Sequence, residues 1–321
     1  MKASKVFLTG GAGFIGANLV KYLLDKGGYT ITVFDNLSAV SKENLDHAVR
    51  DSKQIGKIEF VEGDVLDYEV VESSMHGSEA VIHLAAHPGV VESIDNPEKC
   101  FAVNSIGTFN TLEAARNNGV CTFIFASSNA AVGEQTPPIH EEMVPRPLSP
   151  YGAGKLHGEA LCAAYFRSYG LKAIALRFSN VYGIYSNHKD SVIARFIKRA
   201  KLGESLEVYG DGTQTRDFIN VLDICQAIEL AMKFEPPASI TSLVFQIASG
   251  IETKVIDIAN MVKEYSNIET SGKVNIIFKN VRKGETRRSF SDISKAEVIL
   301  GFKPKSNLRE NVEILLTDRA T

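Results

Sequence analysis

The sequence has 321 residues, of which 44% are hydrophobic and 23% are charged, and its formal net charge is −3. These values are typical of a globular protein with a substantial core, and they give no indication that nucleic acid or an anionic membrane is a partner. The sequence has neither a run of about 20 apolar residues that could span a membrane nor a signal-peptide core, so we expect a cytoplasmic protein.

The chain begins with a pattern of strand, turn and helix. Residues 5–10 (KVFLTG) predict a buried strand and residues 15–26 predict a helix, and between them TGGAGFIG places Gly10, Gly13 and Gly16 at regular spacing. Glycines allow a tight turn and let the backbone approach a pyrophosphate, while the helix N-terminus offers free N–H groups. We therefore predict a dinucleotide-binding turn.

The next two strands supply acidic side chains for the rest of a dinucleotide. The strand TITVFD ends at Asp35, about 20 residues after the glycines, where a carboxylate can accept the ribose hydroxyls. The residues that follow, NLSAV, contain no arginine for a 2′-phosphate, which favours NAD over NADP. After the third strand, EGDVLD places Asp64 and Val65 where they could meet the adenine.

Apolar strands continue to alternate with helical patterns as far as residue 180. The strands are AVIHLAA, CTFIFASS and KAIALRFSNV, and the helices are residues 97–118 and 150–169. Such alternation predicts an α/β fold with a parallel sheet covered on both faces. Later segments are irregular, but a helix at 222–234 and the strand SLVFQIAS are apolar enough to return to the main sheet. We therefore expect one domain at 1–178 plus about 220–250, and a second at about 179–219 plus 251–321.

The segment SPYGAGK predicts a helix with a tyrosine and a lysine on one face. Ser149 is a good N-cap, Pro150 suits the first helical position, and Tyr151 and Lys155 are spaced four residues apart. A neighbouring cation lowers the pKa of a phenol, so Tyr151 could transfer protons. Such a pair also occurs by chance on solvated helices, and the spacing alone leaves both interpretations open.

Several motifs together resemble one family along essentially the whole chain. They are TGGAGFIG, DNLS, GDVLD, HLAA, NSIGTFNTLEAAR, ASSNAAVGE, SPYGAGKLHGE, LRFSNVYG, YGDGTQTRDFINV and GETRRSFSDISKAEVILGFKP. The chain resembles an extended short-chain dehydrogenase/reductase of the NAD-dependent sugar-nucleotide epimerase/dehydratase group, and it is most similar in pattern to UDP-glucose and UDP-N-acetylglucosamine 4-epimerases. This resemblance implies a Rossmann-type doubly wound parallel sheet with a smaller mixed α/β C-terminal domain for the substrate.

The resemblance also implies roles for individual residues. Tyr151 would be the acid/base at the sugar hydroxyl, Lys155 would hold the nicotinamide ribose and lower the pKa of the phenol, and Ser128 would hydrogen-bond the reacting oxygen. Asn180, Arg216 and Arg282 would contact the nucleotide diphosphate, because arginine suits phosphate oxygens. The full set of expected NAD-binding residues is Gly10, Gly13, Phe14, Ile15, Gly16, Asp35, Asn36, Asp64, Val65, Leu84, Ala85, Ala86, Asn104, Ser127, Tyr151, Lys155 and Phe178.

Two positions bear on which reaction is catalysed. Asn129 and Ala130 stand where dehydratases of this group carry an acidic pair, and neither can transfer a proton, which favours a 4-epimerase. Ser289, at the position implied to limit space beside the C2 substituent, leaves room for an N-acetyl group. We therefore expect a UDP-sugar 4-epimerase that accepts UDP-N-acetylglucosamine and UDP-N-acetylgalactosamine, with UDP-glucose and UDP-galactose as further substrates.

Other interpretations stay open. Arg287, Arg288 or His188 could meet the carboxylate of UDP-glucuronate, although we expect these three to be solvated or structural. A dehydratase or ketoreductase of the same family is a further alternative, and a non-catalytic protein that senses NAD is a remote one. Val132 and Pro88 depart from the family pattern in the cofactor pocket, and the loop IYSNHKDS departs from it in the sugar pocket.

The remaining expectations concern metals, partners and one histidine. The histidines and the four cysteines lack metal-ligand spacing, so no metal site is assigned. His83, at the end of a buried strand, is expected to be a hydrogen-bonded core residue. The resemblance implies a homodimer formed through the helix at 97–118 and the helix that carries Tyr151.

Overall fold

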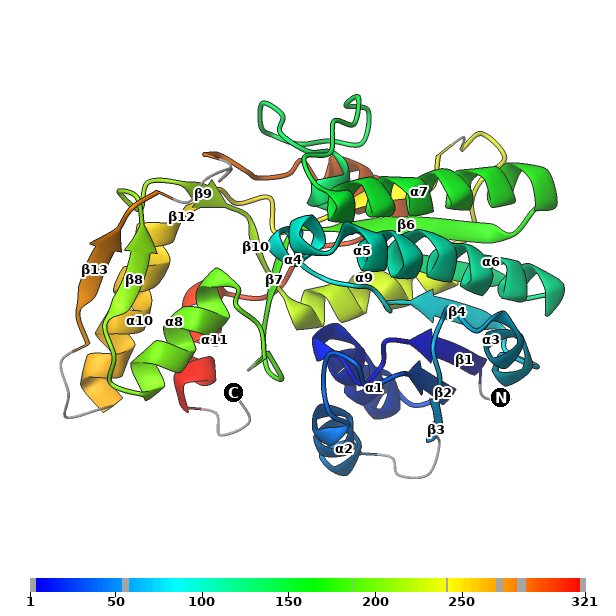
Figure 1. The fold of residues 1–321 in the computed structure, drawn as a ribbon, viewed down its shortest axis with the longest axis horizontal. Coiled ribbons are helices and arrows are strands. Elements are labelled where there is room, and N and C mark those ends of the chain that lie inside the picture. Colours follow the sequence, from blue (N-terminus) through cyan, green and yellow to red (C-terminus); the bar gives the residue numbers. More distant parts are fainter. Residues whose placement is uncertain are drawn as a thin grey trace.

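The computed structural model describes residues 4–53, 58–186, 188–240, 242–269, 274–281 and 287–317. Within these residues, seven parallel strands form one central sheet (Figure 1). From one edge to the other they are β11 (Val244–Ile247), β6 (Lys172–Phe178), β5 (Thr122–Ser128), β4 (Ala80–His83), β1 (Ser4–Thr9), β2 (Tyr29–Asp35) and β3 (Ile58–Glu62). The order reverses between β1 and β4, and ligands of doubly wound sheets bind at the carboxyl ends of the strands there. The predicted fold class is confirmed.

The strands are apolar along their length because both faces of the sheet are covered. On β1, Val6 and Leu8 pack into the core on one face, while Phe7 packs into the core on the other. The strand predicted from SLVFQIAS joins this sheet as β11, beside β6, which confirms that part of the chain returns to it.

Two layers of helices cover the sheet. One face packs against α1 (Phe14–Lys26), α9 (Val221–Lys233) and the π-helix η3 (Ala296–Leu300), with α2 (Glu43–Arg50) beside α1. The other face packs against α3 (Tyr68–Ser74), α6 (Gly107–Asn117) and α7 (Pro150–Tyr169). None of the helices in the described parts of the chain is both long and apolar enough to cross a bilayer.

The single helix expected at 97–118 is three segments in the structure. They are α5 (Pro97–Phe101), the π-helix η1 (Ala102–Ile106) and α6, and a short helix, α4 (Val90–Asp95), precedes them. The side chain of Asn96 accepts the Lys99 N–H at 3.2 Å and so caps α5. A π turn inserts one extra residue into a helix and occurs often at functional sites. Here it carries Asn104.

A smaller part of the chain has a core of its own, at the left of Figure 1. It contains α8 (Val192–Lys201), α10 (Val255–Glu269), α11 (Leu308–Thr317) and the strand pairs β7 (Asn180–Tyr182) with β10 (Phe218–Asn220), β8 (Leu206–Tyr209) with β13 (Ile276–Lys279), and β9 (Thr215–Arg216) with β12 (Thr253–Lys254). We retain the two-domain division as a proposal, with one amendment. Ala296, Leu300 and Phe302 pack into the core beside α9, so their segment groups with the main sheet.

The loop before α8 ties the two parts together. Tyr185 is buried against Ala17 and Ala48, and its backbone φ of +63° lies in the left-handed region. Asn18 and Asn44 donate side-chain hydrogen bonds to the carbonyls of residues 184 and 185, at 2.9 and 3.2 Å. This loop is one of the three places at which the sequence departs from the pattern of the family that it resembles.

Candidate active site

The glycine turn is packed so closely that side chains are excluded. Gly10 has φ +71°, and a Cβ there would lie 2.6 Å from the backbone nitrogen of Ala85. A Cβ on Gly16 would lie 2.4 Å from the carbonyl oxygen of Gly10. Gly13 is the N-cap of α1 and provides no side chain there, so the first N–H groups of the helix face the turn. This cradle fits the pyrophosphate of a dinucleotide.

Asp35 ends β2 beside the turn. Its carboxylate accepts the N–H groups of Ala12 at 3.0 Å and Leu37 at 2.9 Å. Burial raises the pKa of Asp35, and these two hydrogen bonds oppose that effect. Asn36, the residue after Asp35, donates to the carboxylate of Asp64 at 2.8 Å and so links the strand ends that carry the two expected acids.

Asn104 holds the loop after β4, which contains Leu84, Ala85 and Ala86. Its Oδ1 accepts the N–H of His87 at 2.7 Å, and its Nδ2 donates to the carbonyl oxygen of His87 at 3.1 Å. Asn104 is buried, and its amide thereby replaces a backbone partner for this loop. Asn104, which was expected among the NAD-binding residues, thus holds the loop that carries three other members of that set.

His83 is a core histidine, as predicted. It is fully buried, and its ring nitrogens contact the hydroxyls of Thr9 at 2.8 Å and Thr108 at 3.1 Å. Burial, reinforced by the charge of Lys155, lowers its pKa to about 3. His83 is therefore neutral at physiological pH.

Ser128, Tyr151 and Lys155 come together where β5 ends and α7 begins. The side chain of Ser149 accepts the Gly152 N–H at 3.2 Å, so the predicted N-cap is confirmed. Ser128 lies close enough to the phenol of Tyr151 for its side chain to lower the pKa of the tyrosine, against the larger effect of burial. The ammonium of Lys155 lies 5.7 Å from the centre of the Tyr151 ring and donates to the carbonyl of Ala126 at 2.7 Å.

The helix can lie this close because its first turns contain glycines. A Cβ on Gly152 would lie 2.3 Å from the carbonyl oxygen of Ala130, and a Cβ on Gly154 would lie 2.9 Å from the Cβ of Asn104. Neither position has room for a methyl group. The missing side chains of the glycines in SPYGAGK thus allow the start of α7, with Tyr151 and Lys155, to pack closely against its neighbours.

The electrostatics of the tyrosine differ from the sequence-based expectation. Burial raises the pKa of Tyr151 and outweighs the hydrogen bond from Ser128, whereas we expected Lys155 to lower it. Burial also lowers the pKa of Lys155 to about 8. Desolvation disfavours the charged form of both groups, and it is the larger effect in the protein alone. The expected direction was therefore wrong for the chain without its cofactor.

The other expected residues are placed as follows. Ser127, expected at the cofactor, donates a hydrogen bond to Glu159 at 2.5 Å, and Phe178 is buried at the end of β6. Asn180 begins β7 and donates to the carbonyl of Asp217, while Arg216 is half-buried and donates to the carbonyl of Thr215. Of the remaining residues expected to bind the substrate, Ser289 is half-buried and Arg282 lies outside the described residues.

Asn129, which replaces a dehydratase acid, holds a neighbouring segment. Its Nδ2 donates to the hydroxyl of Ser291 at 3.0 Å, and the N–H of Ser291 donates to Asp217 at 3.3 Å. The segment that carries Ser289 is thereby fixed next to the end of β5.

Two of the candidate carboxylate-binding residues are engaged in ion pairs. Arg288 donates two hydrogen bonds to Glu252, both at 2.8 Å, and Arg287 lies 3.3 Å from Asp211. Their structural role was the preferred expectation. His188 is an exposed residue, and partial desolvation of its ring, followed by the charge of Lys189, lowers its pKa.

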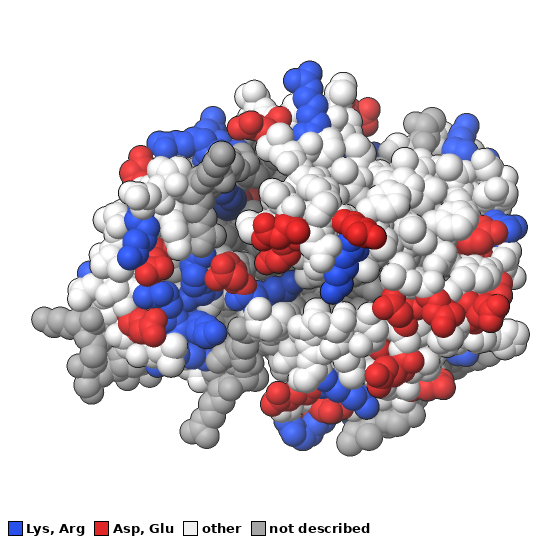
Figure 2. Space-filling model, viewed as in Figure 1, with Lys and Arg blue, Asp and Glu red and all other residues white. Residues whose placement is uncertain are grey.

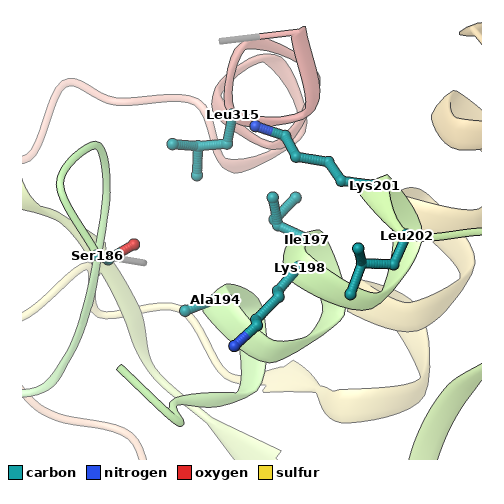
Figure 3. A pocket seen from close by; sticks show the side chains of 7 residues that line it. All are labelled: Ser186, Ala194, Ile197, Lys198, Lys201, Leu202 and Leu315. Carbon is teal, nitrogen blue, oxygen red and sulfur yellow. The ribbon is translucent and has the colours of Figure 1, made fainter. Parts of the chain in front are cut away.

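The hollow between the two parts of the molecule is visible in space-filling view, with Lys and Arg side chains inside it (Figure 2). Two cavities lie elsewhere. One, of about 280 Å³, lies between α8 and α11 and is lined by Ile197, Lys198 and Leu315 among others (Figure 3). The second, of about 320 Å³, is lined partly by Arg287 and Arg288. No member of the expected catalytic or binding set lines either cavity.

Comparisons with known proteins give consistent matches. The family model described as "NAD dependent epimerase/dehydratase family" matches residues 6–242. The structure of UDP-glucose 4-epimerase from Thermotoga maritima with UDP-glucose is 34% identical, covers 97% of both chains and has a TM-score of 0.86. That of UDP-N-acetylglucosamine 4-epimerase from Methanobrevibacter ruminantium M1, in complex with UDP-N-acetylmuramic acid, is 30% identical over 98% of both chains, with a TM-score of 0.88. UDP-glucuronic acid 4-epimerase from Bacillus cereus, in complex with UDP-glucuronic acid and NAD, is 28% identical over 96% of both chains, with a TM-score of 0.84.

Proposed function

The chain belongs to the NAD dependent epimerase/dehydratase family, and from this premise we propose that it is a UDP-sugar 4-epimerase that acts on UDP-N-acetylglucosamine. The observation that carries the proposal is the proximity of Ser128 and Tyr151 in a fold that also contains a closely packed glycine turn. Such a site can remove the proton of a sugar hydroxyl, and a dinucleotide bound there would accept the hydride from the carbon that bears this hydroxyl.

NAD is the cofactor of this family, and the residues present fit it. The turn at Gly10 and Gly16 leaves backbone N–H groups for the pyrophosphate, and Asp35 stands at the end of β2 for the adenosine ribose. Bound NAD⁺ would supply a reversible hydride acceptor for C4 of the sugar, and its positive charge would favour the phenolate of Tyr151.

The chain's own residues move the proton. Tyr151 takes the proton of the C4 hydroxyl and gives it back after the 4-keto sugar has turned over in the pocket. Ser128 hydrogen-bonds the reacting oxygen, and the charged form of Lys155 favours the phenolate. Asn129 and Ala130 offer no acid or base at the positions where an elimination of water would need one, so the reaction ends at the epimer.

The substrate is proposed from one side chain and from two relatives. Ser289 is small and half-buried, which leaves space beside C2 of the sugar for an N-acetyl group. The Methanobrevibacter relative is named for UDP-N-acetylglucosamine, and the Thermotoga relative binds UDP-glucose. Arg287 and Arg288 are paired with acids, so neither favours a glucuronate substrate.

Replacing Ser289 tests this specificity. We expect Ser289→Tyr to abolish turnover of UDP-N-acetylglucosamine and to spare turnover of UDP-glucose, because the larger ring would occupy the space of the N-acetyl group. The assay is proton NMR of each sugar nucleotide with the wild-type and variant proteins. Equal loss of both activities, or no change in either, would contradict the assignment of Ser289.

We also propose a homodimer. Ile94, Phe101 and Phe109 on α4, α5 and α6 are 59, 62 and 45% exposed, and these segments pack beside α7. Such a row of apolar side chains is unusual on a monomer. A second copy of the same face would cover it as a bundle of helices.

A further inference from the structure

A buried ion pair lies directly behind the catalytic residues. Glu159 on α7 accepts two hydrogen bonds from Arg177 on β6, at 2.8 and 2.7 Å, and both side chains are 4% exposed. The carboxylate also accepts the hydroxyl of Ser127 on β5 at 2.5 Å. One side chain of the helix is thereby bonded to two neighbouring strands of the sheet.

The position of this carboxylate relates it to the catalytic side chains. Glu159 follows Lys155 by four residues and Tyr151 by eight, so all three lie along one face of α7. Ser127 is the residue before Ser128 on β5. The hydrogen bond between Glu159 and Ser127 therefore connects the helix that carries Tyr151 to the strand that carries Ser128.

The contact is tight as well as polar. A Cβ on Gly158 would lie 2.3 Å from the ring of Phe125, so α7 is pressed onto β5 beside Glu159. A bidentate bond between a guanidinium and a carboxylate has a fixed geometry. The Glu159–Arg177 pair therefore restricts the position and the rotation of α7 on the sheet more than apolar contacts would.

Glu159 also provides the negative charge near Lys155. The ionisable groups around these two residues, on their own helix and on the segments packed against it, are His83, Cys100, Tyr151, Cys162 and Arg177, and Lys295 lies beyond Arg177. His83 is neutral, and burial raises the pKa of the Cys100 and Cys162 thiols, so these are uncharged at neutral pH. Burial lowers the pKa of Lys155, whereas Cys100 and then Glu159 raise it; of these two groups, Glu159 is the carboxylate.

We propose that Glu159 is a positioning residue for the reaction: it fixes α7 against β5 and β6, and it places a carboxylate four residues after Lys155 on the same face of the helix. The proposal rests on the roles assigned above to Tyr151 and Lys155. A buried ion pair is weak support for stability, because well-packed neutral substitutes are often as stable. The desolvation cost of burying these two charges is explained if the ion pair positions the catalytic residues.

The test compares Glu159→Gln with the double variant Glu159→Gln/Arg177→Gln. The single variant leaves a buried guanidinium without its anion and is expected to lose stability, whereas the double variant removes both charges and is expected to recover it. Both variants should be purified with bound NAD, and turnover should be measured between about pH 6 and pH 10.

In the single variant we expect the alkaline fall in kcat to move about one pH unit lower, because the carboxylate near Lys155 is gone while the cation of Arg177 remains. In the double variant we expect a smaller shift in the same direction. Turnover at pH 6 should fall less than turnover at pH 8. A double variant that is stable and has the wild-type pH profile would overturn the proposal, since the role would then be structural only. A wild-type protein that produces no 4-epimer would instead refute the proposed function.

Discussion

Replacing Gly16 by alanine should damage the cofactor site and the fold together. The added methyl carbon would lie 2.4 Å from the carbonyl oxygen of Gly10 and 2.5 Å from the Cα of Gly11, whereas ordinary contacts begin at 3.4 Å. The backbone of Gly10 and Gly11 would have to move away from α1 by about 1 Å. It cannot do so freely, because Gly10 already lies against the backbone of Ala85 and donates to the carbonyl of Phe34 at 2.9 Å.

The magnitude follows from the cost of overpacking. A clash with backbone atoms belongs at the upper end of the usual range, about 3 kcal/mol, which lowers Tm by about 6 °C. If the displaced turn also loses one N–H contact to a phosphate, the affinity for NAD falls at least about tenfold. The assays are thermal unfolding by circular dichroism and the NAD content of the purified protein.

Gly13→Ala is the matched control. Its methyl carbon would meet only the carbonyl oxygen of Gly10, at 3.3 Å, so Tm should stay close to that of the wild type. The methyl would stand at the first turn of α1, where the pyrophosphate is proposed to bind, and the NAD content should still fall. A Gly16→Ala protein with the Tm and NAD content of the wild type would refute the packing argument.

Four further predictions concern chemistry and assembly. Tyr151→Phe should lower kcat about 1,000-fold while the protein retains NAD, and NMR turnover measurements that show full activity would contradict the role of the phenol. Asp35→Asn should weaken NAD binding by about tenfold or more in calorimetry, because it removes a charged acceptor for Ala12, Leu37 and the ribose; unchanged affinity would argue against that site. The kcat of the wild type should fall above about pH 8, since Lys155 is charged only below its lowered pKa; a profile that is flat to pH 10 would exclude this requirement. Phe101→Glu should convert the proposed dimer to a monomer in light scattering after size exclusion, and a wild-type monomer would disprove the dimer.

The sequence predicts most of the elements that position the site. The apolar strands, the glycine turn and the cap at Ser149 are specified locally, because each depends on a few consecutive residues with a clear physical preference. The structure accordingly begins α7 at Pro150 and brings Tyr151 to Ser128. The helices α2 and α4 were missed because they are short and partly exposed.

Features that depend on tertiary contacts could not be predicted from short stretches of the sequence. The π turn at Asn104 interrupts a continuous helical pattern, and its reason is the loop after β4, which is distant in the sequence. The pair Glu159 and Arg177 joins a helix and a strand, and only the four-residue spacing from Lys155 to Glu159 signalled that the two share a face. The direction of the Tyr151 pKa was wrong because a sequence shows neighbouring charges but not the extent of burial.

The measurement that tests the account most directly is proton NMR of the purified protein in D₂O with UDP-N-acetylglucosamine and no added NAD. We predict UDP-N-acetylgalactosamine with protium retained at C4, because the hydride removed from that carbon returns to it from a tightly held cofactor. Formation of a 4-keto or 6-deoxy sugar, deuterium at C4 of the product, or no reaction with any UDP-sugar would contradict the proposed epimerase.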